Sequence, residues 1–268
     1  MNSEHAAEVE AGTRFEFGRN WSRFLGLLND IRIRQAQASL QQMLGVESLH
    51  GKRFLDVGSG SGLFSLAAHN LGAQVYSFDY DPMSVSCTAE LRRRYADGGG
   101  NWQVEQGSVL DDEYLHSLGQ HDVVYSWGVL HHTGDMAKAF SNIIPAVAPG
   151  GQLFVAIYND QGWISRYWRA VKKFYNKHSQ TRYVLAAVHA PYLVGARWLV
   201  RILTGRLKHD RGMSLWYDMI DWLGGYPFEF AKPAEIEALM HNQGFVLKKQ
   251  KNCGRRMGCN EFVFERPR

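Results

Sequence analysis

The stretch FLDVGSGSG, residues 54–62, decides the fold of this chain. A short apolar run that suits a strand leads into glycines at 58, 60 and 62, and residues 61–71 look helical. Glycine lets a ligand approach the backbone, and the first turn of a helix offers N–H groups and a positive dipole end. Taken alone, this turn is a plain strand-to-helix connection, a nicotinamide dinucleotide site or the site of a different cofactor.

The glycine spacing argues against the nicotinamide interpretation. The dinucleotide fingerprint reads G-x-G-x-x-G, whereas the glycines here alternate and Asp56 stands two positions before the first. Asp79 follows Gly58 by 21 residues and ends the next predicted strand, where a carboxylate can accept hydrogen bonds from both hydroxyls of a ribose. Asp81 is expected to be the N-cap of the following helix.

Strands and helices alternate outward from this stretch. Such alternation predicts an α/β fold in which a parallel sheet is covered by helices on both faces. The last two strands are expected to pair antiparallel across a glycine-rich turn. The predicted strands are residues 53–57, 74–78, 102–106, 122–126, 152–158, 245–251 and 261–265, and the predicted helices are 61–71, 82–95, 137–147 and 233–242, with a turn at 149–151.

Five motifs follow one another in a recognisable order. They are D-x-G-x-G-x-G from Asp56, then Asp79, GSVLD at 107–111, DVVYSWGVLHH at 122–132 and APGGQL at 148–153. This series resembles that of class I S-adenosylmethionine-dependent methyltransferases, in particular the ubiquinone/menaquinone-type and small-molecule group. The resemblance covers about residues 50–160 and, more weakly, 233–265. It implies a Rossmann-like sheet of seven strands, mostly parallel, with the last strand antiparallel.

The resemblance also implies where S-adenosylmethionine binds. The glycine loop holds its methionine part, Asp79 its ribose, and the residues after the second and third strands its adenine, while Trp127 offers a carbonyl to its amine. Ser108 departs from the pattern, because many relatives have Asp there, so the adenine amino group needs another acceptor. The implied cofactor residues are Asp56, Gly58, Ser59, Gly60, Gly62, Asp79, Tyr80, Ser108, Val109 and Trp127.

His131 and His132 are the candidate catalytic residues. Methyl transfer is an in-line displacement in which alignment supplies roughly 7–11 kcal/mol, and a weakly acidic acceptor also needs a base. Both histidines follow the fourth strand, at the edge where such sheets bind ligands, and imidazole accepts a proton near neutral pH. We expect a base or a group that orients the acceptor, with His132 slightly favoured. The alternative is packing at the start of a helix.

Residues 1–48 are expected to form a helical lid. The polar residues 1–13 are the part where disorder is expected, whereas residues 22–45 show apolar positions at helical spacing. In related enzymes this region folds over the cofactor. Trp21 is therefore expected to close on it, and Arg19 or Asn20 to hold the acceptor or the cofactor carboxylate. The alternative is an N-terminal helix that only packs.

Residues 160–225 are predicted to be a helical cap inserted into a core formed by residues 49–159 and 226–268. Between residues 161 and 211 the chain has eleven Lys/Arg and one acid. Three interpretations compete: a solvated face, a site for an anionic sugar or lipid acceptor, and peripheral contact with a membrane. Nucleic acid is less favoured because the whole chain carries only +4. The basic face comprises Arg197, Arg201 and Lys208.

The remaining features of the sequence bear on the location of the protein, on metal binding and on the acceptor site. No signal peptide is visible, and the longest apolar run is shorter than the roughly 20 residues that a bilayer requires. We therefore predict a cytoplasmic protein, with the inner membrane face as a second location. Cys253 and Cys259 lack a zinc spacing and are expected to be buried thiols, so no metal is predicted. The candidate acceptor-binding residues are Arg19, Asn20, Trp21, Asn159, Asp218, Asp221 and Tyr226.

These observations predict an S-adenosylmethionine-dependent methyltransferase. The expected acceptor is an oxygen of a small molecule, a sugar or a lipid-linked glycan. A nicotinamide-dependent oxidoreductase, an RNA-directed methyltransferase and a cofactor-binding protein without turnover are the alternatives. The sequence makes no prediction about the oligomeric state.

Overall fold

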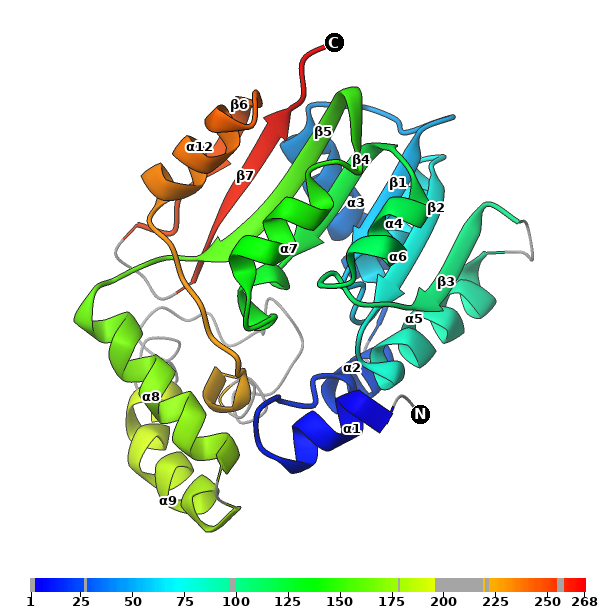
Figure 1. Ribbon diagram of the computed structural model, residues 1–268. Helices are drawn as coiled ribbons and strands as arrows, with labels where there is room; N and C mark the ends of the chain where they lie inside the picture. Colours follow the sequence, from blue (N-terminus) through cyan, green and yellow to red (C-terminus); the bar gives the residue numbers. More distant parts are fainter. Residues whose placement is uncertain are drawn as a thin grey trace.

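A computed structural model describes residues 3–26, 28–96, 100–177, 179–195, 219, 222–254 and 258–268. Its strands are β1 (Arg53–Val57), β2 (Gln74–Asp79), β3 (Trp102–Gln106), β4 (His121–Trp127), β5 (Val147–Tyr158), β6 (Val246–Lys251) and β7 (Cys259–Glu265). They form one seven-stranded sheet in the order β3-β2-β1-β4-β5-β7-β6 (Figure 1). The pairs from β3 to β5 are parallel, whereas β7 is antiparallel to both of its neighbours. The predicted Rossmann-like fold is confirmed.

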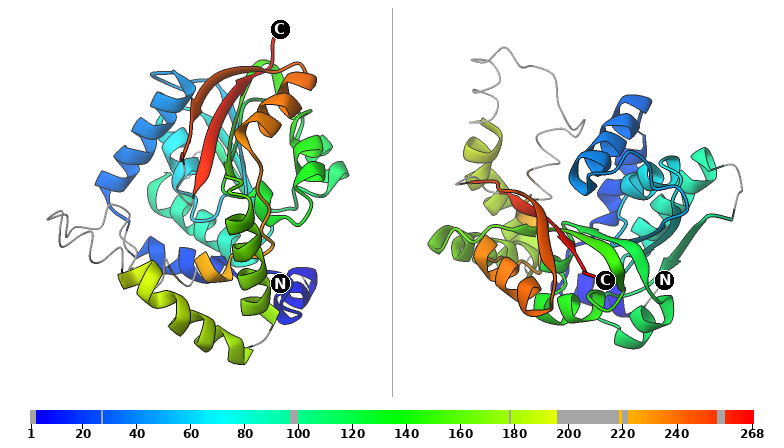
Figure 2. Two further views of the ribbon diagram at one scale, coloured as in Figure 1. Left: turned by 90° about the vertical axis from the view of Figure 1, so that its left-hand side faces the viewer. Right: turned by 90° about the horizontal axis from the view of Figure 1, so that it is seen from above.

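Helices cover both faces of the sheet (Figures 1 and 2). They are α3 (Asp30–Leu44), α4 (Leu63–Asn70), α5 (Pro82–Tyr95), α6 (Asp112–Leu118), α7 (Met136–Ile143) and α12 (Pro233–Asn242). Phe54 and Leu55 alternate along β1, so Phe54 enters the core under α3, α4 and α5, and Leu55 enters the core under α6, α7 and α12. Burial on both faces explains why the central strands are continuous apolar runs.

The connection into β5 differs from the prediction. Helix α7 ends at Ile143 rather than at residue 147, and β5 begins at Val147, so residues 149–151 lie within the strand. The pairing jumps from His121↔Val147 to Val123↔Gln152, which makes an irregularity in the β4–β5 ladder. Proline and glycine are tolerated in a strand at such a bulge, which explains why a turn signal stands inside one.

The N-terminal region is more ordered and more divided than predicted. Residues expected to be disordered form α1 (Ser3–Glu10), because His5 is buried beside the ring of Tyr80 and the carboxylate of Asp81. The single helix predicted from residue 22 is two helices, α2 (Gly18–Leu25) and α3. Asn29 accepts a hydrogen bond from the backbone of Arg32 and thereby begins α3 as its N-cap.

Where the structure describes the inserted segment, it shows two helices and a π-helical turn, α8 (Trp163–Lys177), α9 (Ser179–Ala190) and η2 (Pro191–Gly195). They stand beyond the lower edge of the sheet in Figure 1, near α1 and α2. The buried face of α8 forms a third core with residues of the return segment, including Met219, Leu223 and Phe228. Among the described residues, helices occupy most of 163–195 in the predicted cap. Five predicted functional residues lie outside the described residues, namely Arg197, Arg201, Lys208, Asp218 and Asp221.

Candidate active site

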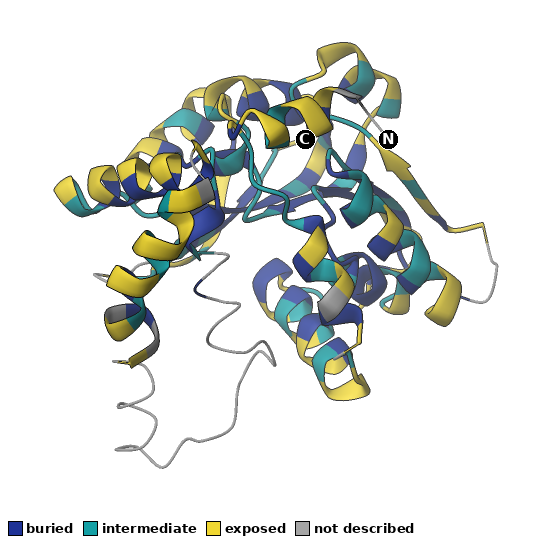
Figure 3. Ribbon diagram, turned by 90° about the horizontal axis from the view of Figure 1, so that it is seen from below, coloured by how far each residue is buried: buried dark blue, intermediate teal, exposed yellow. Residues whose placement is uncertain are grey.

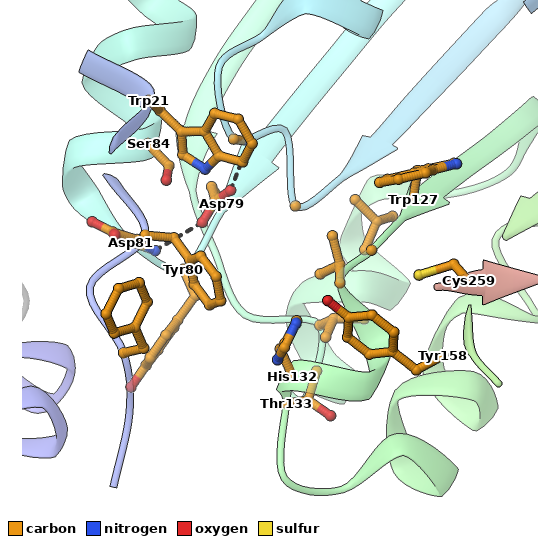
Figure 4. Close-up of a pocket in the computed structure, with 18 of the residues that line it drawn as sticks. Trp21, Asp79, Tyr80, Asp81, Ser84, Trp127, His132, Thr133, Tyr158 and Cys259 are labelled. Atoms are coloured by element: carbon orange, nitrogen blue, oxygen red, sulfur yellow. Dashed lines mark hydrogen bonds between the residues drawn. The ribbon is translucent and has the colours of Figure 1, made fainter. Parts of the chain in front are cut away.

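One large cavity, about 1040 Å³ in volume, lies at the carboxyl edge of the sheet. The last residues of β1, β2, β4 and β5 line it, together with the first residue of β7. The open edge of an α/β sheet is where ligands bind in such folds. Figure 4 shows how the N-terminal segment and the strand ends enclose this space.

The glycine loop after β1 passes close to its neighbours. Gly58 and Gly60 both have positive φ angles, +79° and +56°, in the left-handed region that favours glycine. A Cβ atom on Gly58 would lie 2.5 Å from Val129, and one on Gly60 would lie 3.1 Å from the indole nitrogen of Trp21. Both positions therefore require glycine, and both glycines line the cavity.

Asp79 stands at the mouth of this loop (Figure 4). Its Oδ2 accepts a hydrogen bond from the N–H of Gly60 at 2.9 Å, and its Oδ1 accepts one from the N–H of Asp81 at 2.9 Å. Each oxygen keeps a further lone pair for a ligand. Burial raises the pKa of Asp79 to about 6, although the backbone donors oppose the shift. The two backbone donors thus fix the orientation of this half-buried carboxylate at the cavity. Its two oxygens are suited to accept hydrogen bonds from the two hydroxyls of a diol.

Three predicted cofactor residues support the loop without lining the cavity. Asp56 is 2% exposed, and its Oδ2 accepts a 2.5 Å hydrogen bond from the hydroxyl of Ser65. Burial raises its pKa to about 7. Ser59 turns its hydroxyl to Thr88 at 2.9 Å, and Gly62 begins α4. In this structure Asp56 acts on the loop from beneath and makes no part of the cavity wall.

The other predicted cofactor residues surround the same space. Tyr80, Ser108, Val109 and Trp127 all line the cavity, as do Gly58, Gly60 and Asp79. The guanidinium of Arg14 lies 4.8 Å from the centre of the Tyr80 ring and fixes its outer side. The hydroxyl of Ser108 accepts a hydrogen bond from the backbone of Leu110 at 3.2 Å.

The two histidines have different positions. His132 lines the cavity, and its Nδ1 donates a 2.6 Å hydrogen bond to the carbonyl of Pro227, which leaves Nε2 as the acceptor nitrogen. His131 is fully buried, and its Nδ1 accepts a hydrogen bond from the N–H of Tyr158 at 3.4 Å. Burial, with Lys172 and Arg14 nearby, lowers the pKa of His132 to about 3 and so keeps the imidazole neutral.

Of the three predicted lid residues, one lines the cavity and two do not. Trp21 lines the cavity over the glycine loop (Figure 4), whereas Arg19 is exposed and pairs with Glu16 at 2.9 Å, and Asn20 is buried away from it. Sequence reasoning missed Arg14, whose guanidinium donates to the carbonyls of His132 and Thr133 at 3.1 and 3.4 Å. A lone arginine in a polar segment carries no pattern that could have revealed this role.

The wall opposite the glycine loop is aromatic. Tyr158 and Trp222 line it beside His132, with ring centroids of Tyr158 5.5 Å from His132 and 5.8 Å from Trp222. Tyr158 was missed, although its position at the end of a predicted strand is a usable signal. Asn159 and Tyr226 do not line the cavity. Asn159 instead bonds the backbone of residue 254 and the side chain of residue 260.

Cys253 and Cys259 are not the buried thiols that the sequence predicts. Both are partly exposed and line the cavity. They stand beyond the last β6–β7 pair, Lys251↔Glu261, and Cys259 pairs with Tyr158 of β5. Among the residues described, no three His, Cys, Asp or Glu side chains gather as metal ligands.

Comparisons with known proteins assign the chain to a family. A family described as "Methyltransferase domain" matches residues 28–250, well over half of the chain. The chain belongs to this methyltransferase family. The prediction of a class I S-adenosylmethionine-dependent methyltransferase is thereby confirmed.

Individual relatives of this methyltransferase are distant. The ubiquinone biosynthesis O-methyltransferase of Xanthomonas axonopodis pv. citri is 25% identical over 224 residues, which cover 84% of this chain and 72% of that protein. Magnesium protoporphyrin IX methyltransferase from Synechocystis PCC 6803, solved with bound SAH, has a TM-score of 0.56 at 14% identity and covers 92% of both chains. An N1-methyltransferase of 1,6-didemethyltoxoflavin from Burkholderia thailandensis has a TM-score of 0.51 at 13% identity, covering 90% of this chain and 80% of the other. These structures share the fold.

Proposed function

We propose that this methyltransferase transfers a methyl group from S-adenosylmethionine to an oxygen of a small-molecule acceptor, which His132 orients. The observation that carries the proposal is the division of one cavity into two chemically different halves. Bare backbone and Asp79 form one half, and His132 with Tyr158 and Trp222 forms the other. The relatives named as ubiquinone biosynthesis O-methyltransferases support oxygen as the acceptor atom.

The first half fits the cofactor. Gly58 and Gly60 would let its methionine part approach the backbone, the two oxygens of Asp79 would accept from the ribose hydroxyls, and Tyr80, Ser108 and Val109 would border the adenine. The carbonyl of Trp127 would accept from the amine. When bound, the cofactor supplies an electrophilic methyl group on a positively charged sulfur. Ligand pockets commonly measure about 300–1,000 Å³, so a cavity of about 1040 Å³ has room for a second ligand beside it.

The second half fits an acceptor with a hydroxyl group. The Pro227 carbonyl holds the neutral tautomer of His132 in which Nε2 accepts a hydrogen bond. Because burial keeps the pKa of His132 at about 3, its imidazole is a weak base, and it suits orientation of the hydroxyl better than full removal of its proton. Tyr158 and Trp222 provide flat apolar walls that restrict how a ring can lie. Alignment of oxygen, methyl and sulfur is therefore the main contribution to rate.

Two measurements test this proposal. Calorimetric titration should show binding of S-adenosylhomocysteine by the full chain and loss of most of that binding in Asp79→Ala; tighter binding of NADH would overturn the cofactor assignment. Labelled S-adenosylmethionine with a panel of phenols, hydroxylated quinones and sugars should yield an O-methyl product. His132→Ala should lower its rate about a hundredfold through loss of alignment, with His241→Ala, at an exposed position outside the cavity, as the control. A product methylated on nitrogen or carbon would refute the choice of oxygen.

A further inference from the structure

The helices of the inserted segment present an unusual outer surface. Of ten large apolar side chains that are exposed in the described structure, six lie on α8 and α9. They are Trp163, Tyr167, Phe174, Tyr183, Val184 and Val188. The side chains of Trp163 and Tyr183 are the extremes, 70% and 83% exposed. Figure 3 shows these helices standing out from the molecule with many exposed residues.

The apolar residues of α8 follow helical geometry. Trp163, Tyr167, Ala170 and Phe174 are spaced by four, three and four residues, so they form one stripe along the helix. This stripe is separate from the buried stripe of Trp168, Val171 and Tyr175, which faces the third core. A surface helix normally buries its one apolar stripe and turns polar residues outward. A second stripe of apolar side chains that is exposed to water is unfavourable, and such surfaces commonly mark interaction sites.

Positive charge accompanies this exposed stripe. Residues 161–195 contain six Lys/Arg and no Asp or Glu. Five of the six are exposed, and four of these lie along α8 beside the stripe, at spacings of three, four and four residues. They are Arg166, Arg169, Lys173, Lys177 and, on α9, Arg182. Lys and Arg beside an aromatic and aliphatic stripe are the composition of a helix that lies in the interface of an anionic bilayer.

We propose that α8 and α9 are a docking surface for an anionic phospholipid membrane. Trp163 and Phe174 insert at the level of the headgroups, while Arg166 and Lys173 contact lipid phosphates. The proposed contact is peripheral, with the helices lying in the plane of the interface. Among the described residues no helix has the length and apolarity to cross a bilayer. The aliphatic Val184 and Val188 favour lipid over nucleic acid, because they offer no ring on which a base can stack.

The buried side of the same helix connects this surface to the active site. The ammonium group of Lys172, fully buried on α8, donates to the carbonyl of Trp222 and lies 4.4 Å from the centre of its ring. Asn176, one turn later, donates to the carbonyl of Gly224 at 2.7 Å. One face of α8 therefore holds the aromatic wall of the acceptor half, and the opposite face meets the membrane.

Flotation of the full-length protein with vesicles tests the docking surface. We expect binding to vesicles of phosphatidylcholine mixed with phosphatidylglycerol, little binding to phosphatidylcholine alone, and release as salt is raised. Arg166→Gln with Lys173→Gln should weaken binding about 25-fold, or about fivefold for each charge. Arg34→Gln with Arg94→Gln removes two charges elsewhere and should weaken it far less. Failure to bind anionic vesicles would overturn the proposal.

A second variant pair separates the apolar contribution. Trp163→Ser with Phe174→Ser should weaken vesicle binding about tenfold or more, whereas Ile31→Ser, at another exposed apolar position, should not. Cofactor binding should be unchanged in both, so a failure here is distinguishable from a failure of the proposed methyl transfer. An equal loss of vesicle binding in the Trp163→Ser/Phe174→Ser variant and in Ile31→Ser would refute the proposed docking surface. A change of oligomeric state in the first variant would assign the stripe to a second copy of the chain, and binding of single-stranded RNA in place of vesicles would assign it to nucleic acid.

Discussion

Asp79 has an ionisation that should be visible in ligand binding. Its carboxylate accepts two backbone hydrogen bonds and, in the proposed complex, two from the ribose. Burial raises its pKa to about 6, so at about pH 5 roughly nine in ten molecules carry a protonated acid that has lost acceptor capacity. The affinity for S-adenosylhomocysteine should therefore fall about tenfold between about pH 7.5 and pH 5. The Asp79→Asn variant should bind S-adenosylhomocysteine weakly at both pH values. The same fall in affinity with pH in that variant would contradict the assignment of the titration to Asp79.

Lys172 should control the ionisation of His132. Desolvation is the larger cause of the lowered pKa of His132, and the positive charge of Lys172 is the next. Lys172→Met removes the charge but retains the length of the side chain, so the pKa of His132 should rise toward its ordinary value of about 6.5. The imidazole signals in an NMR pH titration measure this shift. Lys172→Arg keeps the charge and should keep the pKa of His132 low; an equal pKa of His132 in the two variants would show that the charge of Lys172 does not lower it.

Residue types were predicted better than side-chain directions. Gly58 and Gly60 have positive φ angles and line the cavity, and a glycine pattern can indicate such a turn because only local conformation is involved. Asp56 was placed at the ligand by resemblance, yet in the structure it bonds Ser65 beneath the loop, which depends on how α4 packs on β1. Arg14 reaches His132 across 118 residues of sequence, and no local pattern encodes such a contact.

Asp81 links two elements, the lid and α5. Its carboxylate accepts hydrogen bonds from the N–H of Gly18 at 2.7 Å and from the N–H of Met83 at 2.9 Å. Asp81→Ala should lower the free energy of unfolding by about 2 kcal/mol, near the upper end for an N-cap, and should also weaken binding of S-adenosylhomocysteine. Urea unfolding and calorimetry measure the two effects.

Asp111 provides the matched control for this prediction. It is the N-cap of α6 and accepts from the N–H of Tyr114 at 3.0 Å, with no lid attached to it. Asp111→Ala should cost about 1 kcal/mol of stability and leave cofactor binding unchanged. If both variants bind the ligand equally well, the lid does not depend on Asp81.

Elements with strong local signals were predicted closely, and the others depended on tertiary contacts. The proline at N1 and the aspartate before it placed the start of α5 correctly. The polar sequence of α1 has little apolar periodicity, and the helix is held by His5 against Tyr80 instead. In β5, residues 149–151 have a sequence typical of a turn. They lie within the strand instead, at the irregularity where its pairing with β4 shifts register.

The stability of the whole molecule should depend on a buried histidine far from the cavity. Burial lowers the pKa of His121 to about 4. Below about pH 6.5 the unfolded chain protonates this side chain, whereas the folded protein does not until about pH 4, so its contribution falls as the pH decreases through that window. Asp56, with a pKa raised to about 7, acts in the opposite sense, and the test therefore compares variants.

The loss of unfolding free energy from about pH 7.5 to pH 5 should be smaller by about 2 kcal/mol in His121→Gln than in the unchanged protein. Urea denaturation at the two pH values measures it. His241→Gln, at an exposed position in α12, should leave the loss as it is. Equal losses in all three proteins would show that His121 is protonated in the folded state.

The cavity wall runs from His5 to Glu261 and so uses almost the whole length of the chain. β7, the last strand along the chain, is inserted between β5 and β6 rather than added at an edge. On the ribosome, the lid helices emerge before Asp81 and the other residues against which they dock, and the space for β7 stays open until residues 259–265 have emerged. A nascent chain that already has the glycine loop therefore lacks part of the cavity wall until β7, which contributes Cys259 and Glu261, has joined the sheet.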